Sequence, residues 1–480
     1  MNSKSFKITA QLKKNIDTLL SGKHGSLFIN FYSKRYNIPK EVLNQYFKLR
    51  ISLNYNLKNA EFDNSLSKSS IFLSTIKYIG YLLYVLFFSK VINKKYECSL
   101  LVDDLQHFGE IDRWLQLEKE FTVEKTVFIA KSHTVKSINN NNIVYREQLK
   151  DYDRSLLIKD LPRLLFSDLF FLILRSLKLN INLVHLHQYF INDYLYYETL
   201  FRICSARYMI QDRNLGRTNA LKNHLFKKSG GIAASCIQKN ILEHGTSALF
   251  YDADIFFSYG NKTSEDIMAL GGRIQEIVPV GSFSMDNSLA KLNLNPMSSK
   301  HFDILYIGQN TTSTKTNWEF NYESISWLVK LIGELTNLKV AIKHHNTWTG
   351  DDEELEITKN SGIKYIDYSE NSYDLGLKSN LVLTYGSSMG YELLSQGVKV
   401  AFLDPGNENP FINNFVYSDN IIINSYTDLK LLIQNDQINN QNLIVKKSED
   451  YCLTELGVSK RIYDYLSSYN PNNIKYDIKN

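Results

Sequence analysis

Short runs of apolar, β-branched residues alternate along the chain with segments in which apolar residues recur every three or four positions. One run, at 381–384, is followed by a helical pattern that begins near Ser388 and closes at Gly397, and a second apolar run follows at 398–403. The runs are typical of strands buried in a parallel sheet, and the longer segments are typical of amphipathic helices. The pattern therefore predicts an α/β protein built from βαβ units.

The alternation occurs in two series, which a polar, turn-rich segment at 284–301 separates. The first series starts near Glu97 and the second starts at Asp303. Such a segment is a good linker between domains. We predict a helical, basic region at 1–95, a Rossmann-like domain at 96–290, a second Rossmann-like domain at 291–410, and C-terminal helices at 411–480 that cross back over the first domain and end in a frayed tail.

Two apolar segments require a decision about membrane contact. The run at 71–88 is about long enough to span a bilayer, but Lys77 and several tyrosines interrupt it, and further lysines follow it at Lys90, Lys94 and Lys95. A spanning helix, an interfacial amphipathic helix and a buried or partner-facing helix all stay open, and we favour the last. The run at 164–177 contains Asp168 and Arg175 and is too short to span, so we expect a core helix.

An alternating segment at 181–187 is predicted to be another strand. His185 and His187 would then project from one face of it. A metal pair is one reading of this spacing. Because no carboxylate or cysteine follows at a matching spacing, structural histidines are the better interpretation.

Polar residues follow the ends of several predicted strands in the second series. The carboxyl ends of parallel strands share one sheet edge, where backbone N–H groups and a helix N-terminus bind anions. Ser387 and Ser388 would place two hydroxyls at such a helix start, and Glu392, one turn later, would reach a ribose hydroxyl. The sequence therefore predicts a nucleotide-phosphate pocket formed by Gly308, Gln309, His344, His345, Tyr368, Ser387, Ser388 and Glu392.

The first series offers two candidates for chemistry. Asp212 lies in a polar loop after the predicted strand 207–210 and is a candidate base, although a capping loop with solvated charges explains it as well. Glu243 and His244 precede Gly245, which lets the backbone approach a ligand closely. A carboxylate beside an imidazole can transfer a proton or stabilise a leaving phosphate.

Two acidic pairs are better explained by structure. Asp103 and Asp104 end the predicted strand at 97–104, where they would cap the following helix or act as acid and base. Asp252 and Asp254 form a DxD pattern that some metal-dependent transferases share, but here it runs directly into an apolar strand. We interpret it as a strand entry, and we predict no metal site.

The amino-acid composition excludes few classes of protein. Of the 480 residues, 44% are hydrophobic and 22% are charged, which is ordinary for a globular protein. The net charge of +5 suits an anionic ligand or an anionic membrane surface without requiring nucleic acid. The four cysteines are widely spaced, and the N-terminus has no signal-peptide pattern, so we expect a cytoplasmic protein with reduced thiols.

The motif string resembles a bacterial family that builds lipopolysaccharide O-antigen or capsule on the GT-B glycosyltransferase architecture. It consists of EHG at 243–245, ADIFFSYG at 253–260, IVPVGSF at 277–283 and GSSMGYE at 386–392. The resemblance covers roughly residues 180 to 410 and extends to CDP-glycerol glycerophosphotransferases and to transferases of Kdo and sialic-acid-type sugars from CMP donors. In the CMP-dependent enzymes a His-Pro pair and a Ser/Thr-Ser pair hold the CMP phosphate and ribose. Ser387 and Ser388 match the second pair, whereas His344 and His345 stand in place of the first without its proline.

The resemblance implies a metal-independent glycosyltransferase of cell-envelope biosynthesis. It would move a sugar from a nucleotide-activated, CMP-linked donor to a glycan or lipid-linked glycan acceptor, without a cofactor and without nucleic acid. His345, Ser387 and Ser388 would hold the phosphate, Glu392 the ribose and Tyr368 the base, while Glu243 or Asp212 would act on the acceptor. The enzyme would be cytoplasmic and could contact the inner face of the membrane peripherally. Three alternatives stay open: a CDP-glycerol-type glycerophosphotransferase, a non-hydrolysing sugar-nucleotide epimerase and a non-catalytic scaffold of a polysaccharide assembly complex.

Overall fold

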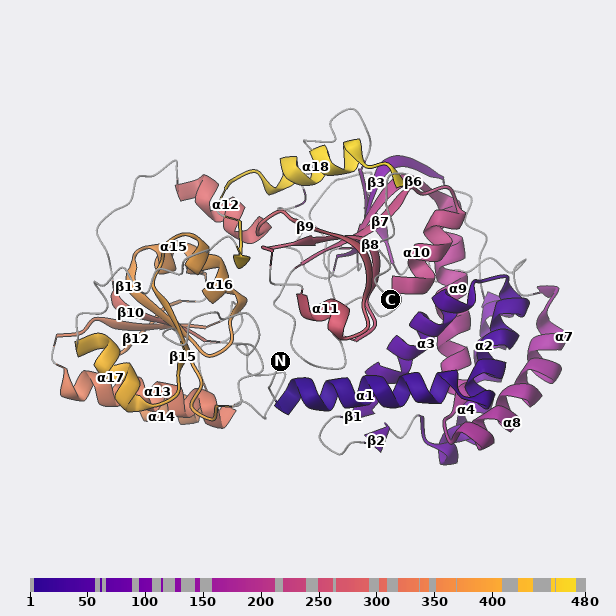
Figure 1. The fold of residues 1–480 in the computed structure, drawn as a ribbon, viewed down its shortest axis with the longest axis horizontal. Coiled ribbons are helices and arrows are strands. Elements are labelled where there is room, and N and C mark those ends of the chain that lie inside the picture. Colours follow the sequence, from indigo (N-terminus) through magenta and orange to yellow (C-terminus); the bar gives the residue numbers. More distant parts are fainter. Residues whose placement is uncertain are drawn as a thin grey trace.

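The computed structural model of the chain contains two parallel sheets and a helical N-terminal region (Figure 1). It describes residues 4–56, 61–62, 66–88, 95–105, 114, 126–130, 143–146, 158–211, 219–238, 249–261, 265–292, 302–308, 318–335, 337–344, 351–367, 369–407, 422–434, 450–453 and 455–471.

The first sheet is parallel throughout, with the strand order β5-β4-β3-β6-β7-β8-β9. We call it the N-terminal sheet. Its central strands carry apolar residues on both faces, as a sheet covered on both sides requires. The strands are β3 (Tyr96–Leu105), β4 (Thr126–Ala130), β5 (Ile143–Tyr145), β6 (Cys204–Gln211), β7 (Ala233–Ile237), β8 (Asp252–Ser258) and β9 (Arg273–Pro279).

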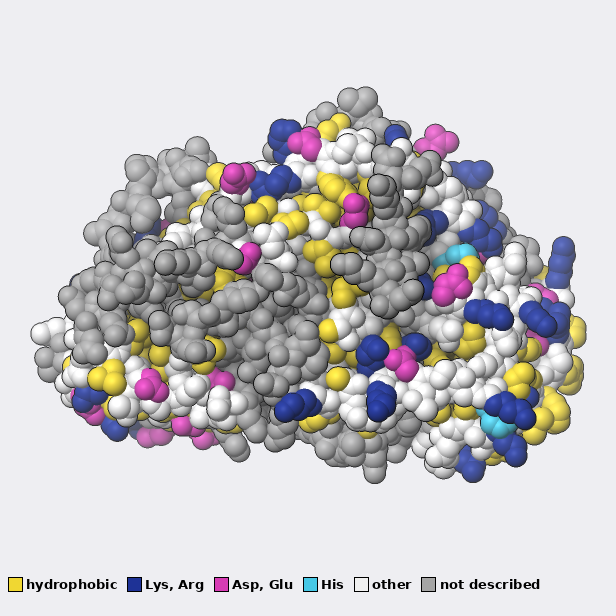
Figure 2. All heavy atoms as spheres, in the orientation of Figure 1, with side chains coloured by type: hydrophobic (Ala, Val, Ile, Leu, Met, Phe, Trp, Pro, Cys, Tyr) yellow, Lys and Arg dark blue, Asp and Glu magenta, His cyan; other side chains and the backbone are white. Residues whose placement is uncertain are grey.

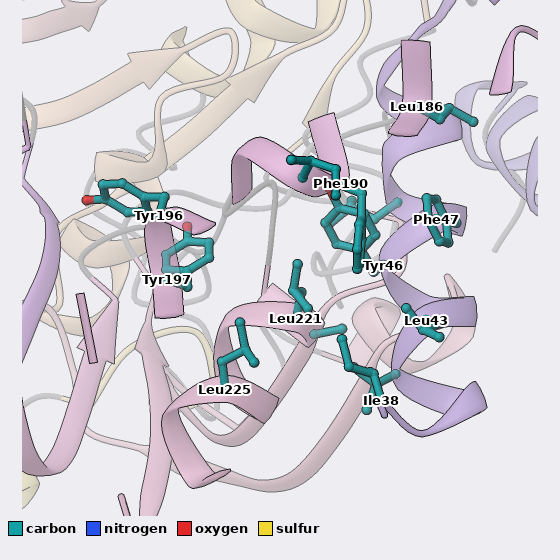
Figure 3. Packing of buried hydrophobic residues seen from close by; sticks show 14 of the residues in the cluster. Ile38, Leu43, Tyr46, Phe47, Leu186, Phe190, Tyr196, Tyr197, Leu221 and Leu225 are labelled. Atoms are coloured by element: carbon teal, nitrogen blue, oxygen red, sulfur yellow. The ribbon is translucent and has the colours of Figure 1, made fainter. Parts of the chain in front are cut away.

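Helices from the start of the chain pack with the helices of this sheet. In Figure 3, Ile38, Leu43 and Phe47, in and just before α3, lie near Phe190 of α9 and Leu221 of α10, and all five side chains are buried in one cluster. The N-terminal region and the first sheet therefore share a hydrophobic core. The helices are α1 (Lys4–Ser21), α2 (Lys23–Tyr36), α3 (Lys40–Leu53), α4 (Ile71–Phe88), α7 (Leu161–Arg163), α8 (Leu169–Leu179), α9 (Leu183–Ile203), α10 (Asn219–Lys228) and α11 (Glu265–Ala269); a π-helical turn (Leu164–Asp168) joins α7 to α8, a 3-10 turn (Lys68–Ser70) precedes α4, and β1 (Tyr55–Asn56) pairs with β2 (Glu61–Phe62).

The strand predicted at 181–187 is wrong, because this segment begins helix α9. The side chain of Asn182 caps the helix by accepting a hydrogen bond from the His185 N–H. On the helix, His187 is buried, its Nε2 lies 2.9 Å from the Tyr78 hydroxyl, and its Nδ1 contacts the Tyr32 hydroxyl. Burial lowers the pKa of His187 to about 3, so the ring is neutral and serves the packing of three helices.

The second sheet is also parallel, with the order β12-β11-β10-β13-β14-β15. We call it the C-terminal sheet. Its strands are β10 (Phe302–Ile307), β11 (Val340–Lys343), β12 (Lys364–Tyr365), β13 (Ser379–Thr384), β14 (Val400–Leu403) and β15 (Ile422–Ile423), and its helices are α13 (Trp318–Glu334), α14 (Asp352–Thr358), α15 (Ser372–Leu377), α16 (Ser388–Ser395) and α17 (Tyr426–Gln434).

Two further helices connect the sheets. The segment predicted as a linker at 284–301 starts instead inside α12 (Phe283–Leu292), so the predicted boundary near residue 290 falls within a helix. The boundary predicted at 410 also lies before β15 and α17, which belong to the C-terminal sheet and its core. By contrast, α18 (Val458–Ser468) packs on the N-terminal sheet, where Val458, Ile462 and Leu466 are buried (Figure 1).

The predicted fold class is confirmed. Two parallel α/β sheets lie side by side, a C-terminal helix returns to the first of them, and four helices precede them, as expected for a GT-B-like protein with an added helical region (Figure 1).

Candidate functional site

The C-terminal sheet changes direction between β10 and β13. The chain runs outward from β10 through β11 to β12 and then returns to place β13 on the other side of β10. Thr384, at the end of β13, donates a hydrogen bond from Oγ1 to the Ile307 carbonyl at the end of β10 (2.8 Å). In open parallel sheets, ligands bind at the carboxyl ends of the strands beside such a reversal.

Ser387 and Ser388 lie at this reversal. Ser387 caps α16, and its Oγ accepts a hydrogen bond from the Met389 N–H (3.3 Å). The Ser387 N–H donates to Thr384 Oγ1 (3.0 Å), which fixes the turn from strand to helix. Both serines are half-buried and stand beside the positive end of the helix dipole; the Ser387 hydroxyl caps the helix, and the Ser388 side chain hydrogen-bonds to Glu392.

Gly308 and His344 lie at the neighbouring strand ends. A Cβ at Gly308 would stand 2.0 Å from His344 Nδ1, so the glycine is what allows the imidazole to pack there. The His344 ring is buried, and its Nε2 lies 2.5 Å from Oε1 of Glu354, which also accepts a hydrogen bond from the Tyr365 hydroxyl (2.9 Å). The structure therefore brings His344 to the predicted edge but holds it against α14.

Lys343 ends β11 directly before this histidine. Its side chain is buried, and its Nζ donates to the His344 carbonyl (3.1 Å). Burial lowers the pKa of this lysine, while Asp367 and Glu370 partly oppose the shift. Lys343 thus places a buried amine at the carboxyl end of β11, and the motif reasoning did not single it out.

Glu392 joins the two halves of the molecule. Its carboxylate is buried and accepts hydrogen bonds from Ser282 Oγ (2.5 Å) and the Tyr373 hydroxyl (2.8 Å). Burial raises the pKa of Glu392 to about 7, although hydrogen bonds from Ser282, Tyr373 and Ser388 oppose the shift. Ser282 follows β9 of the N-terminal sheet, so this contact couples the start of α16 to the other sheet.

The N-terminal sheet reverses direction in the same way between β3 and β6. Lys222 of α10 reaches this point, and its buried Nζ donates to Asp103 Oδ2 (2.8 Å) and Gln211 Oε1 (2.6 Å). Asp103 is therefore one half of a buried ion pair. The sequence had suggested a helix cap or an acid–base residue, and neither interpretation included this pair. Asp212, the candidate base, follows Gln211 directly in the sequence.

The acidic residues of the DxD pattern are held by cations. Asp252 pairs with Arg273 (2.5 Å), and Asp254 pairs with Lys227 (2.7 Å) and accepts a hydrogen bond from the Ala234 N–H (2.9 Å). These contacts fit the predicted structural role at a strand entry. In the part of the chain that the structure describes, no three His, Cys, Asp or Glu residues are grouped to hold a metal ion.

Six predicted site residues lie outside the described residues: Asp212, Glu243, His244, Gln309, His345 and Tyr368. Their roles stay predictions. Of the others, the structure brings Gly308, His344, Ser387 and Ser388 to one sheet edge and places Glu392 behind them.

Sequence reasoning missed the residues that support the site. Ser282 and Tyr373 hold Glu392, and Lys222 occupies the reversal of the first sheet. Ser282 did carry a local signal, because it follows Gly281 in the IVPVGSF motif at 277–283. Its partner lies 110 positions further on, so the contact itself had no sequence signal.

Comparisons with known proteins give similarity to solved structures only. No protein-family model and no curated protein matches the sequence. The UDP-GlcNAc 2-epimerase of Neisseria meningitidis, solved with UDP-GlcNAc, aligns at 11% identity over 78% of this chain and all of its own (100%), with a TM-score of 0.48. MnaA of S. aureus, solved with UDP, aligns at 12% identity over 77% of this chain and 96% of its own, with a TM-score of 0.47. The wall teichoic acid polymerase TagF aligns at 12% identity over 83% of this chain and 97% of its own, with a TM-score of 0.46. Identities this low carry no information about substrates, so function is argued from this chain's own residues.

Proposed function

We propose that the protein is a glycosyltransferase that moves a sugar from a nucleotide-activated donor to a growing cell-surface glycan. The observation that carries the proposal is the position of Ser387 and Ser388. They stand half-buried at the start of α16, at the reversal of the C-terminal sheet. This combination of groups suits the phosphate of a nucleotide donor.

The chemistry follows from the charge that develops on the leaving nucleotide. The N–H groups that open α16, the two serine hydroxyls and the Lys343 cation would stabilise the departing phosphate. Because these groups supply the compensating charge, we propose that transfer needs neither a metal ion nor a cofactor. The ion pairs of Asp252 and Asp254 support this, since they engage the carboxylates that a DxD metal site would use.

The finer assignments rest on the motif resemblance. A CMP-linked donor is proposed because Ser387 and Ser388 match the Ser/Thr-Ser pair of CMP-dependent transferases. Asp212 or Glu243 is proposed to act on the acceptor. A lipid-linked glycan of lipopolysaccharide or capsule is the proposed acceptor, and the enzyme is proposed to act on the cytoplasmic side of the membrane.

A thermal-shift screen against CMP, CDP, UDP and GDP tests the proposal. A nucleotide at about a hundredfold its Kd stabilises the folded chain by about 2.7 kcal/mol, and we expect this shift with CMP. Ser388→Ala should reduce the shift, whereas Asp252→Ala should leave it intact, each measured against the variant's own unliganded Tm. The reverse pattern would place the pocket elsewhere.

Turnover assays separate the alternatives. A CMP-sugar transferase should release CMP from a CMP-sugar, and its rate should not change when EDTA is added. Turnover of CDP-glycerol without turnover of CMP-sugars would favour the glycerophosphotransferase. Binding of no nucleotide at millimolar concentration would favour a scaffold.

A further inference from the structure

Helix α4 has two sharply different faces. Its buried residues are Ile71, Ser74, Tyr78, Leu82 and Val85, which face α9 and its neighbours. The opposite face carries large apolar side chains in solvent, and Phe72 is 77% exposed. The other members of this exposed stripe recur at helical spacing: Leu73, Ile76, Leu83, Tyr84, Phe87 and Phe88.

Helix α8 and the turn before it repeat the arrangement. Phe166 is 75% exposed and Phe170 is 65% exposed, and Leu174 and Leu177 continue the same stripe. The segment predicted as a core helix therefore buries only one face. Both α4 and α8 pack on α9 and touch each other, so the two helices lie side by side. Figure 2 shows hydrophobic side chains, with Lys and Arg among them, at the edge where Figure 1 places α7 and α8.

We call these outward stripes the α4–α8 surface. It consists of Phe72, Leu73, Ile76, Leu83, Tyr84, Phe87, Phe88, Phe166, Phe170, Leu174 and Leu177. Exposed basic residues surround it at Lys68, Lys77, Lys159, Arg163 and Lys178.

Acidic residues are few in the described segments that carry the surface, and each is paired with a cation. Asp160 and Asp168 are the acidic residues at 68–88 and 158–179, and Arg35 pairs with both of them. Apolar side chains within a basic margin match a bilayer that contains anionic lipid, because the apolar groups enter the interface while the cations contact headgroups. A protein partner of mixed surface charge would not require that the charged residues around the apolar side chains are all basic.

The contacts on the buried face of α4 indicate whether this helix lies on the bilayer or crosses it. Asn182 donates from Nδ2 to Ser74 Oγ (2.8 Å), and the Tyr78 hydroxyl lies 2.9 Å from His187 Nε2. The helix is long and apolar enough to cross a membrane by length and composition. Crossing would break these buried polar contacts and remove α4 from the core, so the helix is built to stay attached to the protein.

We propose that the α4–α8 surface docks the protein on the surface of a bilayer that contains anionic lipid. The apolar stripes of both helices would enter the interface, and the basic residues around them would contact lipid headgroups. The inference rests on these two helices alone and does not depend on the nucleotide site.

Vesicle co-sedimentation with the full chain tests the proposal. We expect binding to phosphatidylcholine vesicles that contain phosphatidylglycerol, with weaker binding to phosphatidylcholine alone and at high salt. The combined variant Phe72→Ser, Phe166→Ser and Phe170→Ser should bind roughly tenfold more weakly or worse, because it loses apolar area that would enter the interface. The variant Lys77→Glu with Lys178→Glu should lose the preference for anionic vesicles.

A matched control uses exposed apolar residues on other elements. Met268→Ser, Leu355→Ser and Leu431→Ser together remove comparable exposed side chains from α11, α14 and α17, and vesicle binding should be unchanged. All variants should unfold near the wild-type temperature, since none alters a buried group. Equal binding by the Phe variant and the wild-type chain would overturn the proposal. The proposal would also be overturned if the wild-type chain did not bind vesicles but formed a dimer, and if the Phe variant were monomeric. A second copy of the chain would then cover the surface.

Discussion

At the scale of single residues, the buried carboxylate of Glu392 is the most informative group. It receives hydrogen bonds from Ser282 of one half and Tyr373 of the other, and burial raises its pKa to about 7. In the unfolded chain the same carboxyl titrates near 4.5. Between these values the folded chain keeps a proton that the unfolded chain has released. Stability should therefore fall as the pH rises from about 4.5 to about 7 and stay level above that range.

Glu392→Gln removes this titration while keeping an oxygen that can accept both hydrogen bonds. We expect the variant to be more stable than the wild-type chain at about pH 8, by roughly 3 kcal/mol, and to match it near pH 4.5. Urea unfolding at the two pH values measures the difference. A variant that is less stable than wild type by the same amount at both values would mean that the carboxylate is ionised in the folded chain.

At the scale of elements, local sequence patterns predicted some helices and strands correctly and others wrongly. The predicted strand, helix and strand of 381–403 appear as β13, α16 and β14, because apolar runs, a serine cap and a closing glycine all agree there. The segment 181–187 failed because α9 is buried on most sides, so its apolar residues show no helical period. The cap residue Asn182 was the signal that could have corrected the prediction.

Asn182→Ala should test how α9 and α4 are joined. The substitution removes the cap on the His185 N–H (3.1 Å) and the hydrogen bonds to Ser70 Oγ (2.7 Å) and Ser74 Oγ (2.8 Å). We expect a loss of about 2–3 kcal/mol in the free energy of unfolding, from the cap and from a buried hydroxyl that loses its partner.

Urea unfolding measures this loss. Asn180→Gly is the control, since Asn180 is an exposed residue with a φ of 57° that glycine adopts freely, and it should stay within about 1 kcal/mol of wild type. Equal losses in the two variants would show that the cap and the serine contacts contribute little.

At the scale of the whole molecule, long-range contacts set the arrangement of the halves. Asp286 of α12 accepts hydrogen bonds from the Gly457 and Val458 N–H groups (2.9 and 3.1 Å), so it caps α18 from 171 and 172 positions away. No sequence window contains both partners. The sequence therefore predicted the two αβ series and the strand ends of the candidate site, but not the contacts that bring one half against the other.

Ile462→Ala should show that α18 is part of the first half of the molecule. Ile462 is fully buried in the cluster that contains strands of the N-terminal sheet and Trp114. We expect a loss of about 2–5 kcal/mol, confined to the unfolding transition of that half. Hydrogen exchange measured by mass spectrometry, with peptides of the N-terminal sheet compared with peptides of the C-terminal sheet, follows it, and Leu456→Ala, at an exposed site, should leave the transition in place. A loss confined to the other half would show that α18 does not stabilise the first sheet.

The common core of α1–α4 and the N-terminal sheet has a practical consequence. A fragment beginning at β3 would leave Leu186, Phe190 and Leu221 facing water where α3 and its neighbours now cover them. Such a fragment would aggregate during expression instead of yielding a smaller soluble protein. The first ninety or so residues are thus not a detachable appendage, and homologues that lack them would need larger or different side chains on α9 and α10.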